Sequence, residues 1–77
     1  MESEKDLLDD INSGSRAAMH RLYERYVGYA MAVALRYIPM RDDAEDVVQD
    51  SFIKVFSGIS KFEYRGEGAL QAWLLRI

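Results

Sequence analysis

The sequence predicts an all-α domain, a compact bundle of about four helices. Apolar residues make up 49% of the 77-residue chain. They recur at steps of three and four, which is the period of an amphipathic helix. Strand-like alternation is missing throughout, and Pro39 is the only proline. A chain of this length suits one small domain with a core that is only marginally large enough. We therefore expect a single helical domain over residues 1–77.

The first predicted helix covers residues 3–12. Ser3 is its N-cap, and Asp6 stands three positions later, which is the spacing of a capping box. The turn sequence Asn12-Ser13-Gly14 ends the helix. Its apolar residues are Leu7, Leu8 and Ile11.

The second predicted helix starts after Ser15, a good N-cap, and runs to about Ile38. Pro39 ends it, because proline removes a backbone donor and restricts the residue before it. The stripe that we expect to be buried consists of Met19, Leu22, Tyr26, Ala30, Val33 and Tyr37.

The third predicted helix starts at Asp42 and runs to about Ser57, with Gly58 as its stop. Asp42 and Glu45 have the spacing of a capping box, and acids in the first turn favour the helix dipole. At about 100° per residue, one side of this helix should face the core. That side holds Ala44, Val47, Val48, Ser51 and Val55.

The opposite side of the third helix is a candidate binding patch. It holds Asp46, Gln49, Asp50 and Ile53, with Phe56 at its margin. A branched apolar residue ringed by acids and amides is typical of an interface with an apolar centre and a polar rim. The alternative is that the loop after this helix covers Ile53.

A polar loop over residues 60–68 follows. It combines two aromatic residues with two bases, namely Lys61, Phe62, Tyr64 and Arg65. Such a loop suits single-stranded nucleic acid, because aromatic rings stack on bases and cations follow the phosphates. The alternative is a mobile linker with its aromatic side chains tucked into the core.

The fourth predicted helix starts near Ala69. Its apolar stripe is Leu70, Trp73, Leu74 and Ile77, spaced i, i+3, i+4 and i+7. The stripe favours a core role for Trp73 over stacking on a base. Since the pattern is still running at Ile77, we expect the domain to be truncated within this helix.

The charge is divided unevenly along the chain. The net charge of −3 argues against a simple nucleic-acid binder, which is usually basic. Residues 1–12 carry five acids and one base, and residues 42–50 carry five acids and no base. The remainder carries nine bases and three acids. This division would suit two kinds of macromolecular partner; the alternative is that the charges only solvate helix faces.

Several protein classes are disfavoured. The absence of cysteine excludes disulfides and thiolate metal sites and makes the cytoplasm the default location. The acidic N-terminus is not a signal peptide, and the apolar stretch of residues 27–38 is too short to span a bilayer. The acids of residues 42–50 lack the histidine or glycine of common metal motifs, so no cofactor is expected. No constellation supports an enzyme.

Three motifs in order are similar to those of one family. They are Asp42 to Phe56; the upstream Leu22-Tyr23-Glu24-Arg25-Tyr26 with Ala34-Leu35-Arg36-Tyr37; and the downstream Phe62 with Trp73-Leu74-Leu75-Arg76-Ile77. Together they resemble region two of bacterial sigma factors of the extracytoplasmic-function type. The resemblance covers about residues 15–77, and the order and spacing of the motifs make it specific.

The resemblance implies two partners. Asp46, Gln49, Asp50 and Ile53, with Phe56 beside them, fall where the family contacts the clamp helices of the largest subunit of core RNA polymerase. The loop of residues 61–68 falls where the family pockets a base flipped out of the promoter non-template strand. Phe62 is the matching aromatic. In this loop Gly66-Glu67 come later than in the commonest pattern, after Glu63-Tyr64-Arg65. The resemblance also allows an anti-sigma factor as a partner.

We therefore interpret the chain as a cytoplasmic transcription initiation domain without catalytic activity or membrane insertion. It would dock on core polymerase and help to recognise and melt the promoter minus-ten element. The rival interpretation is a helical protein-interaction adaptor that uses the same Ile53 patch and has no nucleic-acid role.

Overall fold

The computed structural model describes residues 2–75. Over these residues all the regular structure is helical, which confirms the predicted all-α class. The elements are α1 (Glu4–Asn12), α2 (Arg16–Tyr37), α3 (Arg41–Gly58), the 3₁₀ turn η1 (Ile59–Lys61) and α4 (Ala69–Leu74).

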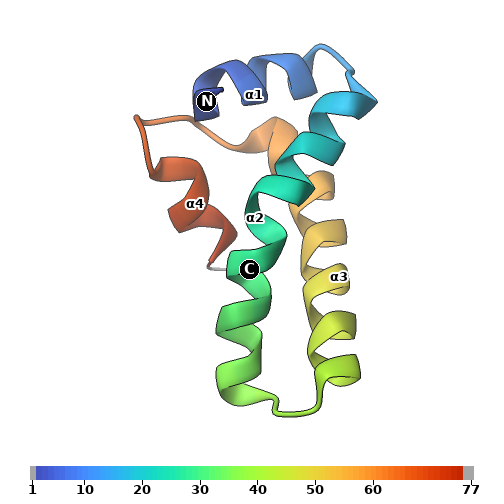
Figure 1. Cartoon of the computed structure of the whole chain (residues 1–77). Helices are drawn as coiled ribbons and strands as arrows, with labels where there is room; N and C mark the ends of the chain where they lie inside the picture. The colour runs from blue at the N-terminus through green and yellow to red at the C-terminus, as the bar shows by residue number, and fades with distance from the viewer. Residues whose placement is uncertain (1, 76–77) are drawn as a thin grey trace.

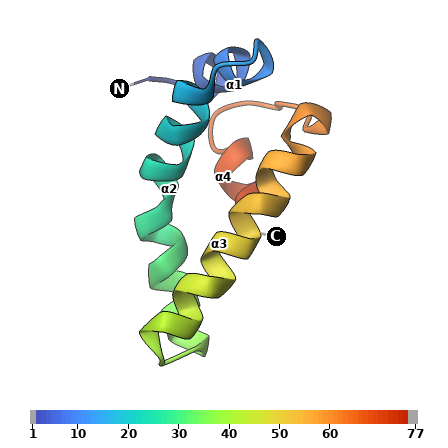
Figure 2. The same ribbon diagram turned by 90° about the vertical axis from the view of Figure 1, so that its right-hand side faces the viewer.

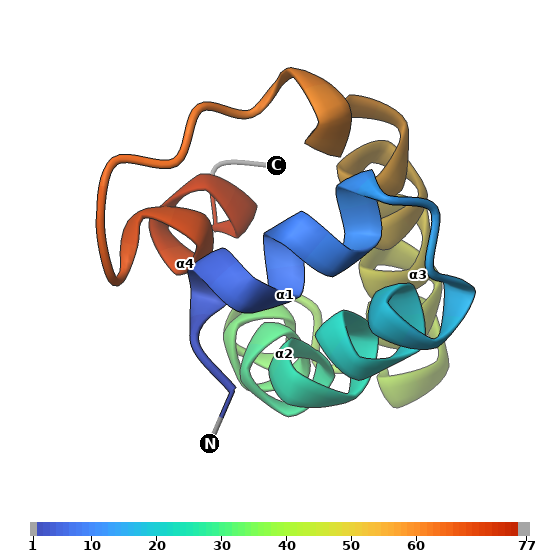
Figure 3. The same ribbon diagram turned by 90° about the horizontal axis from the view of Figure 1, so that it is seen from above.

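The long helices α2 and α3 make an antiparallel hairpin, which is the frame of the molecule (Figure 1). Helix α1 lies across the end of the hairpin where α2 begins and α3 ends, as the view from above shows (Figure 3). Helix α4 lies against one face of the hairpin, in its upper half (Figure 2). The other end of the hairpin carries no third helix in the described part of the chain.

Local capping explains where the first two helices begin. The hydroxyl of Ser3 accepts a hydrogen bond from the backbone N–H of Asp6 at 3.1 Å, and that of Ser15 accepts one from the N–H of Ala18 at 3.1 Å. Each hydroxyl satisfies one of the N–H groups that a helix start leaves without a partner. Both predicted N-caps are therefore confirmed.

The predicted start of α3 is wrong. The helix begins at Arg41, and its N-cap residue, Met40, makes no side-chain capping bond. Asp42 lies inside the first turn, so it cannot cap with Glu45, which instead pairs with Arg41 at 3.4 Å. The acids of the first turn still lie at the positive end of the helix dipole. At the other end, α3 includes Gly58 and continues directly into η1.

The core is built where α1, the first half of α2 and the inner face of α3 meet, and η1 and α4 each add one residue to it. It consists of Leu7, Leu8, Ile11, Ala18, Leu22, Tyr26, Val48, Phe52, Val55, Ile59 and Leu70. Phe52, which the sequence analysis did not assign to the core, makes an edge-on contact with Tyr23 at 4.9 Å between ring centroids.

Two residues predicted to be buried are exposed instead. Tyr37 is 81% exposed, because it stands at the end of the hairpin that neither α1 nor α4 reaches. Val47 is also exposed and borders a shallow hollow with Leu74 and Leu75. Helical periodicity placed both on an inward side, but periodicity does not say whether another element covers that side.

Helix α4 has the predicted apolar stripe over the residues that the structure describes. Leu70 is fully buried, and Trp73 and Leu74 are half-buried against the core. Ile77, the last member of that stripe, lies outside the described residues. The ring of Trp73 lies 4.9 Å from that of Phe62, so the aromatic residue of the loop and that of α4 pack together.

Candidate functional site

The outer face of α3, formed by Asp46, Gln49, Asp50 and Ile53, is exposed along its length. Ile53 is 64% exposed, so the alternative that the following loop covers it is wrong. The inner face of the helix explains this position, since Val48, Phe52 and Val55 are buried and the helical period turns Ile53 away from them. One rigid helix therefore presents an apolar side chain among polar ones.

Phe56 is less available than the four residues of the outer face. It is half-buried, and its ring packs 6.2 Å from that of Phe52. The structure therefore places Phe56 at the boundary between the outer face of α3 and the core, as the predicted marginal position implies.

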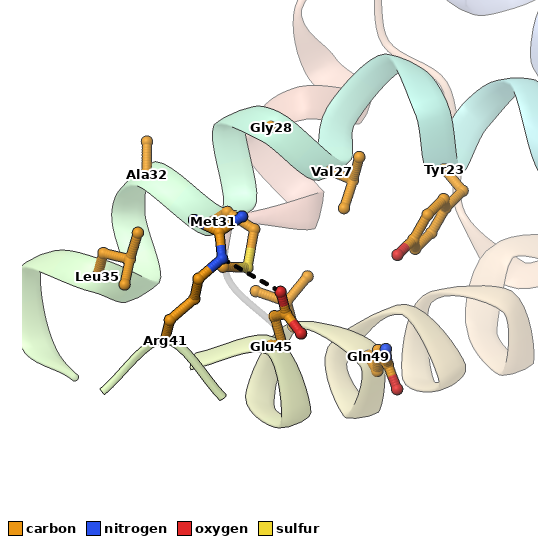
Figure 4. A pocket seen from close by; sticks show the side chains of 10 residues that line it. Tyr23, Val27, Gly28, Met31, Ala32, Leu35, Arg41, Glu45 and Gln49 are labelled. Atoms are coloured by element: carbon orange, nitrogen blue, oxygen red, sulfur yellow. Dashed lines mark ion pairs between the residues drawn. The ribbon is translucent and has the colours of Figure 1, made fainter. Parts of the chain in front are cut away.

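A groove between α2 and α3 adjoins this outer face (Figure 4). It encloses about 680 Å³ and has an apolar wall on α2 formed by Val27, Met31 and Leu35. Its polar wall on α3 includes Gln49, and an ion pair between Arg41 and Glu45 crosses its lower rim. The groove was not predicted from the sequence, although three apolar residues at steps of four form a second stripe on α2.

The loop between η1 and α4 exposes its basic side chains but partly buries its aromatic ones. Lys61 and Arg65 are exposed, and Arg65 pairs with Glu63 at 3.3 Å. Phe62 and Tyr64 are half-buried and packed against the core. The loop thus matches neither alternative fully. Its aromatic rings are partly exposed and partly packed against the core.

Tyr64 is held by its surroundings. Its hydroxyl donates a hydrogen bond to Glu67 Oε2 at 3.4 Å. Partial burial raises the pKa of the Tyr64 phenol above its usual value, and the negative charges of Glu67 and Glu4 raise it further. The phenol therefore stays protonated at neutral pH and remains a hydrogen-bond donor.

A second hollow, of about 600 Å³, opens beside this loop. Its lining combines the loop with the exposed side of α4 and consists of Lys61, Phe62, Glu63, Arg65, Ala69, Ala72 and Trp73. Three of the four loop residues singled out from the sequence line it; Tyr64 does not. The small side chains Ala69 and Ala72 make room for it, a contribution that composition alone did not reveal.

Other kinds of site find no support in residues 2–75. No group of three or more histidine, cysteine or acidic side chains is arranged to hold a metal ion in this part of the chain. None of the described helices is long and apolar enough to cross a membrane.

Comparison with known proteins gives a consistent result. Residues 22–77 match the family model described as Sigma-70 region 2. The chain is 37% identical over 75 residues to the ECF RNA polymerase sigma-E factor of Haemophilus influenzae, an alignment that covers 97% of this chain and 38% of that protein. The sigma-E factors of Salmonella typhimurium and Escherichia coli are 37% and 35% identical over 71 residues, which is 92% of this chain and 36% of each relative. The chain thus spans less than two fifths of the length of these relatives.

Proposed function

The chain belongs to the Sigma-70 region 2 family, and on that premise we propose that it is the core-binding and minus-ten-element domain of a transcription initiation factor. The observation that carries the proposal is the outer face of α3, where Ile53 stands exposed among Asp46, Gln49 and Asp50. This domain acts by binding, in the cytoplasm, and needs no catalytic residue or cofactor.

We propose that the outer face of α3 docks on the clamp helices of the largest polymerase subunit. Ile53 supplies the apolar centre of the contact, and the polar side chains form its rim. Asp46 and Asp50 would meet basic residues of the partner, which speeds association and fixes orientation. Phe56 and the groove beside Gln49 extend the same surface toward α2. An anti-sigma factor that controls this protein would compete for such a surface.

We propose that the hollow beside the loop receives a base flipped out of the promoter non-template strand. Its volume of about 600 Å³ suits a small ligand group, and both Phe62 and Trp73 line it. Aromatic rings stack on unpaired bases, while Lys61 and Arg65 would lie along the phosphates. The later position of Gly66-Glu67 lengthens the loop, and Tyr64 is tied to Glu67 within it.

The proposal is tested by measuring two binding steps with the full chain. The first is binding to core RNA polymerase. The second is binding of the resulting complex to a single-stranded oligonucleotide that carries a minus-ten element, compared with a scrambled strand. We expect core binding and a preference for the minus-ten strand only when core is present. Absence of core binding would overturn the proposal, and core binding without any strand preference would favour the adaptor interpretation.

A further inference from the structure

Glu4, in the first turn of α1, is a buried acid with an unusual set of partners. It is only 2% exposed. Its Oε1 accepts hydrogen bonds from the backbone N–H groups of Gly68 at 2.9 Å and Leu70 at 3.3 Å. Its Oε2 accepts from the N–H of Gln71 at 3.2 Å and from the hydroxyl of Tyr26 at 3.1 Å. A buried carboxylate is tolerated only when it is paired in this way.

These bonds supply the cap that α4 lacks locally. The N-cap residue of α4 is Gly68, which has no side chain and adopts a φ of 90°. Of the N–H groups at this helix start, that of Ala69 reaches the carbonyl oxygen of Gly66 at 3.0 Å, and those of Gly68, Leu70 and Gln71 all reach Glu4. The capping carboxylate therefore comes from more than 60 residues away in the sequence.

Helix α1 is itself fastened to α2, so Glu4 is a fixed point. Arg21 makes two bonds to the Glu2 carboxylate, at 3.0 and 3.2 Å, and a third to Asp10 at 3.0 Å. Arg25 donates to the backbone carbonyl of Glu2 at 2.7 Å. Tyr26 then holds the Glu4 carboxylate from the same helix. These bonds hold the start of α1, and with it Glu4, against α2.

The hollow beside the loop depends on where α4 starts. Ala69, Ala72 and Trp73 line that hollow. The amides that Glu4 accepts from belong to their sequence neighbours Gly68, Leu70 and Gln71. The described part of α4, Ala69–Leu74, is too short to be stable without tertiary support. Releasing its first turn would therefore move the wall of the hollow.

We propose that Glu4 is a positioning residue for promoter-strand binding, because it fixes the start of α4 and thereby the shape of the hollow beside the loop. This inference rests on the proposed function of that hollow. Glu4 lies outside residues 22–77, the part of the chain that matches the family model. The inference makes α1 part of the DNA-binding apparatus without direct contact with DNA.

The first test measures backbone amide exchange by NMR in the full chain. Glu4→Ala should accelerate exchange at Gly68, Leu70 and Gln71 by about fivefold or more, as expected for loss of a helix cap. Amides in the middle of α2 and α3 should be unchanged. Glu4→Gln keeps the shape of the side chain but turns a donor toward one of the N–H groups, so its effect should be concentrated on part of this set. Asp6→Asn, which removes a charge from the same turn of α1, is the control and should change none of the three.

The second test measures strand binding by the chain–core complex. Glu4→Ala should weaken binding of the minus-ten single strand roughly tenfold while core affinity stays within about twofold, and Asp6→Asn should leave both unchanged. Unchanged exchange at the three amides would overturn the inference whatever the function of the hollow. Faster exchange at all amides alike would assign Glu4 to overall stability and overturn it as well. Local acceleration with normal strand binding would show that the start of α4 does not set the hollow. A wild-type complex without strand preference would instead refute the proposed function.

Discussion

Ile53 and Val55 stand two positions apart on α3, and their exposed fractions are 64% and 2%. Helical geometry alone predicts such a contrast, because two positions correspond to about 200° of rotation around the helix axis. The identity of the exposed residue is what suggests function. A single exposed hydrophobic residue needs no explanation, whereas one centred in a polar face is typical of a binding surface.

Ile53→Asp should leave the fold intact and weaken binding to core polymerase by about 2 kcal/mol or more, the usual cost of removing a central apolar side chain from an interface. Circular dichroism and a core-binding titration measure the two effects. Val55→Asp is the matched control, since the same change at a buried position should unfold the domain. Unfolding of the Ile53 variant would show that this residue belongs to the core.

Tyr26 should make the stability of the domain fall at high pH. Burial is the main reason that the pKa of its phenol is raised to about 12. The negative charges of Glu4 and Glu67 also raise this pKa, and the positive charge of Arg25 lowers it. A raised pKa in the folded state means that stability is full below the ordinary value of 10.0 and is lost as the pH rises toward about 12. Denaturant unfolding between these pH values should show a steeper loss for the wild type than for Tyr26→Phe. Equal slopes would show that Tyr26 ionises as freely as in the unfolded chain.

Glu4 shows where prediction from sequence fails at this scale. Its position in the first turn of an amphipathic helix predicts a solvated acid that favours the helix dipole. Its actual partners, Gly68, Leu70 and Gln71, lie on another element, and no local pattern connects them. Contacts of this kind depend on how the helices pack, which single-residue periodicity does not specify.

At the scale of elements, the positions of the helices were predicted well from the sequence, but the packing of one helix on another was predicted poorly. Ser3 and Ser15 are local signals, and both caps are confirmed. The start of α3 was predicted one residue late, because Asp42 is as good a capping residue as any that the turn offers. Val47 lies on a correctly predicted helix, but its exposure depends on how the neighbouring elements cover it. The outer face of α3 was predictable because it needs only one helix.

Asp50→Arg should slow association with core polymerase several-fold at low ionic strength, with Gln49→Ala showing a smaller and salt-independent loss of affinity. Complementary charges mainly raise the association rate, and salt screens them. Stopped-flow association at several salt concentrations measures the effect. Glu24→Arg makes the same charge change on an exposed part of α2 and is the control. An Asp50 variant that associates at the wild-type rate in low salt would remove the acidic docking surface from the proposal.

Replacing Phe62 and Tyr64 by alanine should reduce binding of the minus-ten strand more than it reduces core binding. Stacking of a base on Phe62 would contribute roughly 1–3 kcal/mol, whereas Tyr64 lies outside the hollow and would act by holding the loop through Glu67. Replacing Lys61 and Arg65 should lower the slope of log affinity against log salt by about 0.7 for each phosphate that is no longer neutralised. Lys5→Ala, on α1, is the control for charge. Strand binding by the complex with core, and permanganate reactivity of an opened promoter, report the outcome. Normal values with all four residues replaced would show that the loop is only a connector.

At the scale of the whole molecule, charge separates the two proposed surfaces. Ten of the 13 acids lie in residues 1–12 and 42–50, and nine of the ten bases lie elsewhere. The outer face of α3 is therefore acidic, while the loop beside α4 carries Lys61 and Arg65. This division was readable from the sequence. A single small domain was predicted as well, and the structure adds its longest dimension, about 36 Å.

The chain without core polymerase should bind duplex DNA poorly. Its net charge is −3, and neutralisation of phosphates supplies most non-specific affinity. Fluorescence anisotropy with labelled duplex at fixed salt, with and without core, measures this. We expect a clear gain in affinity when core is added, because the proposed function has the chain meet promoter DNA only as part of the complex with core. Tight duplex binding by the chain alone would contradict the prediction that DNA affinity depends on core polymerase.

The bond from Glu4 to α4 also sets an order of events during synthesis of the protein. The carboxylate is made 64 to 67 residues before the amides that it holds. At roughly 5–20 residues per second, this delay is on the order of 3–13 s. By the end of that interval α1, α2 and α3 have all been made, and they can pair through contacts that are closer in sequence, which form fastest. Glu4 must remain hydrated until α4 is made, so the helix that lines the hollow beside the loop is locked in place only after α1, α2 and α3.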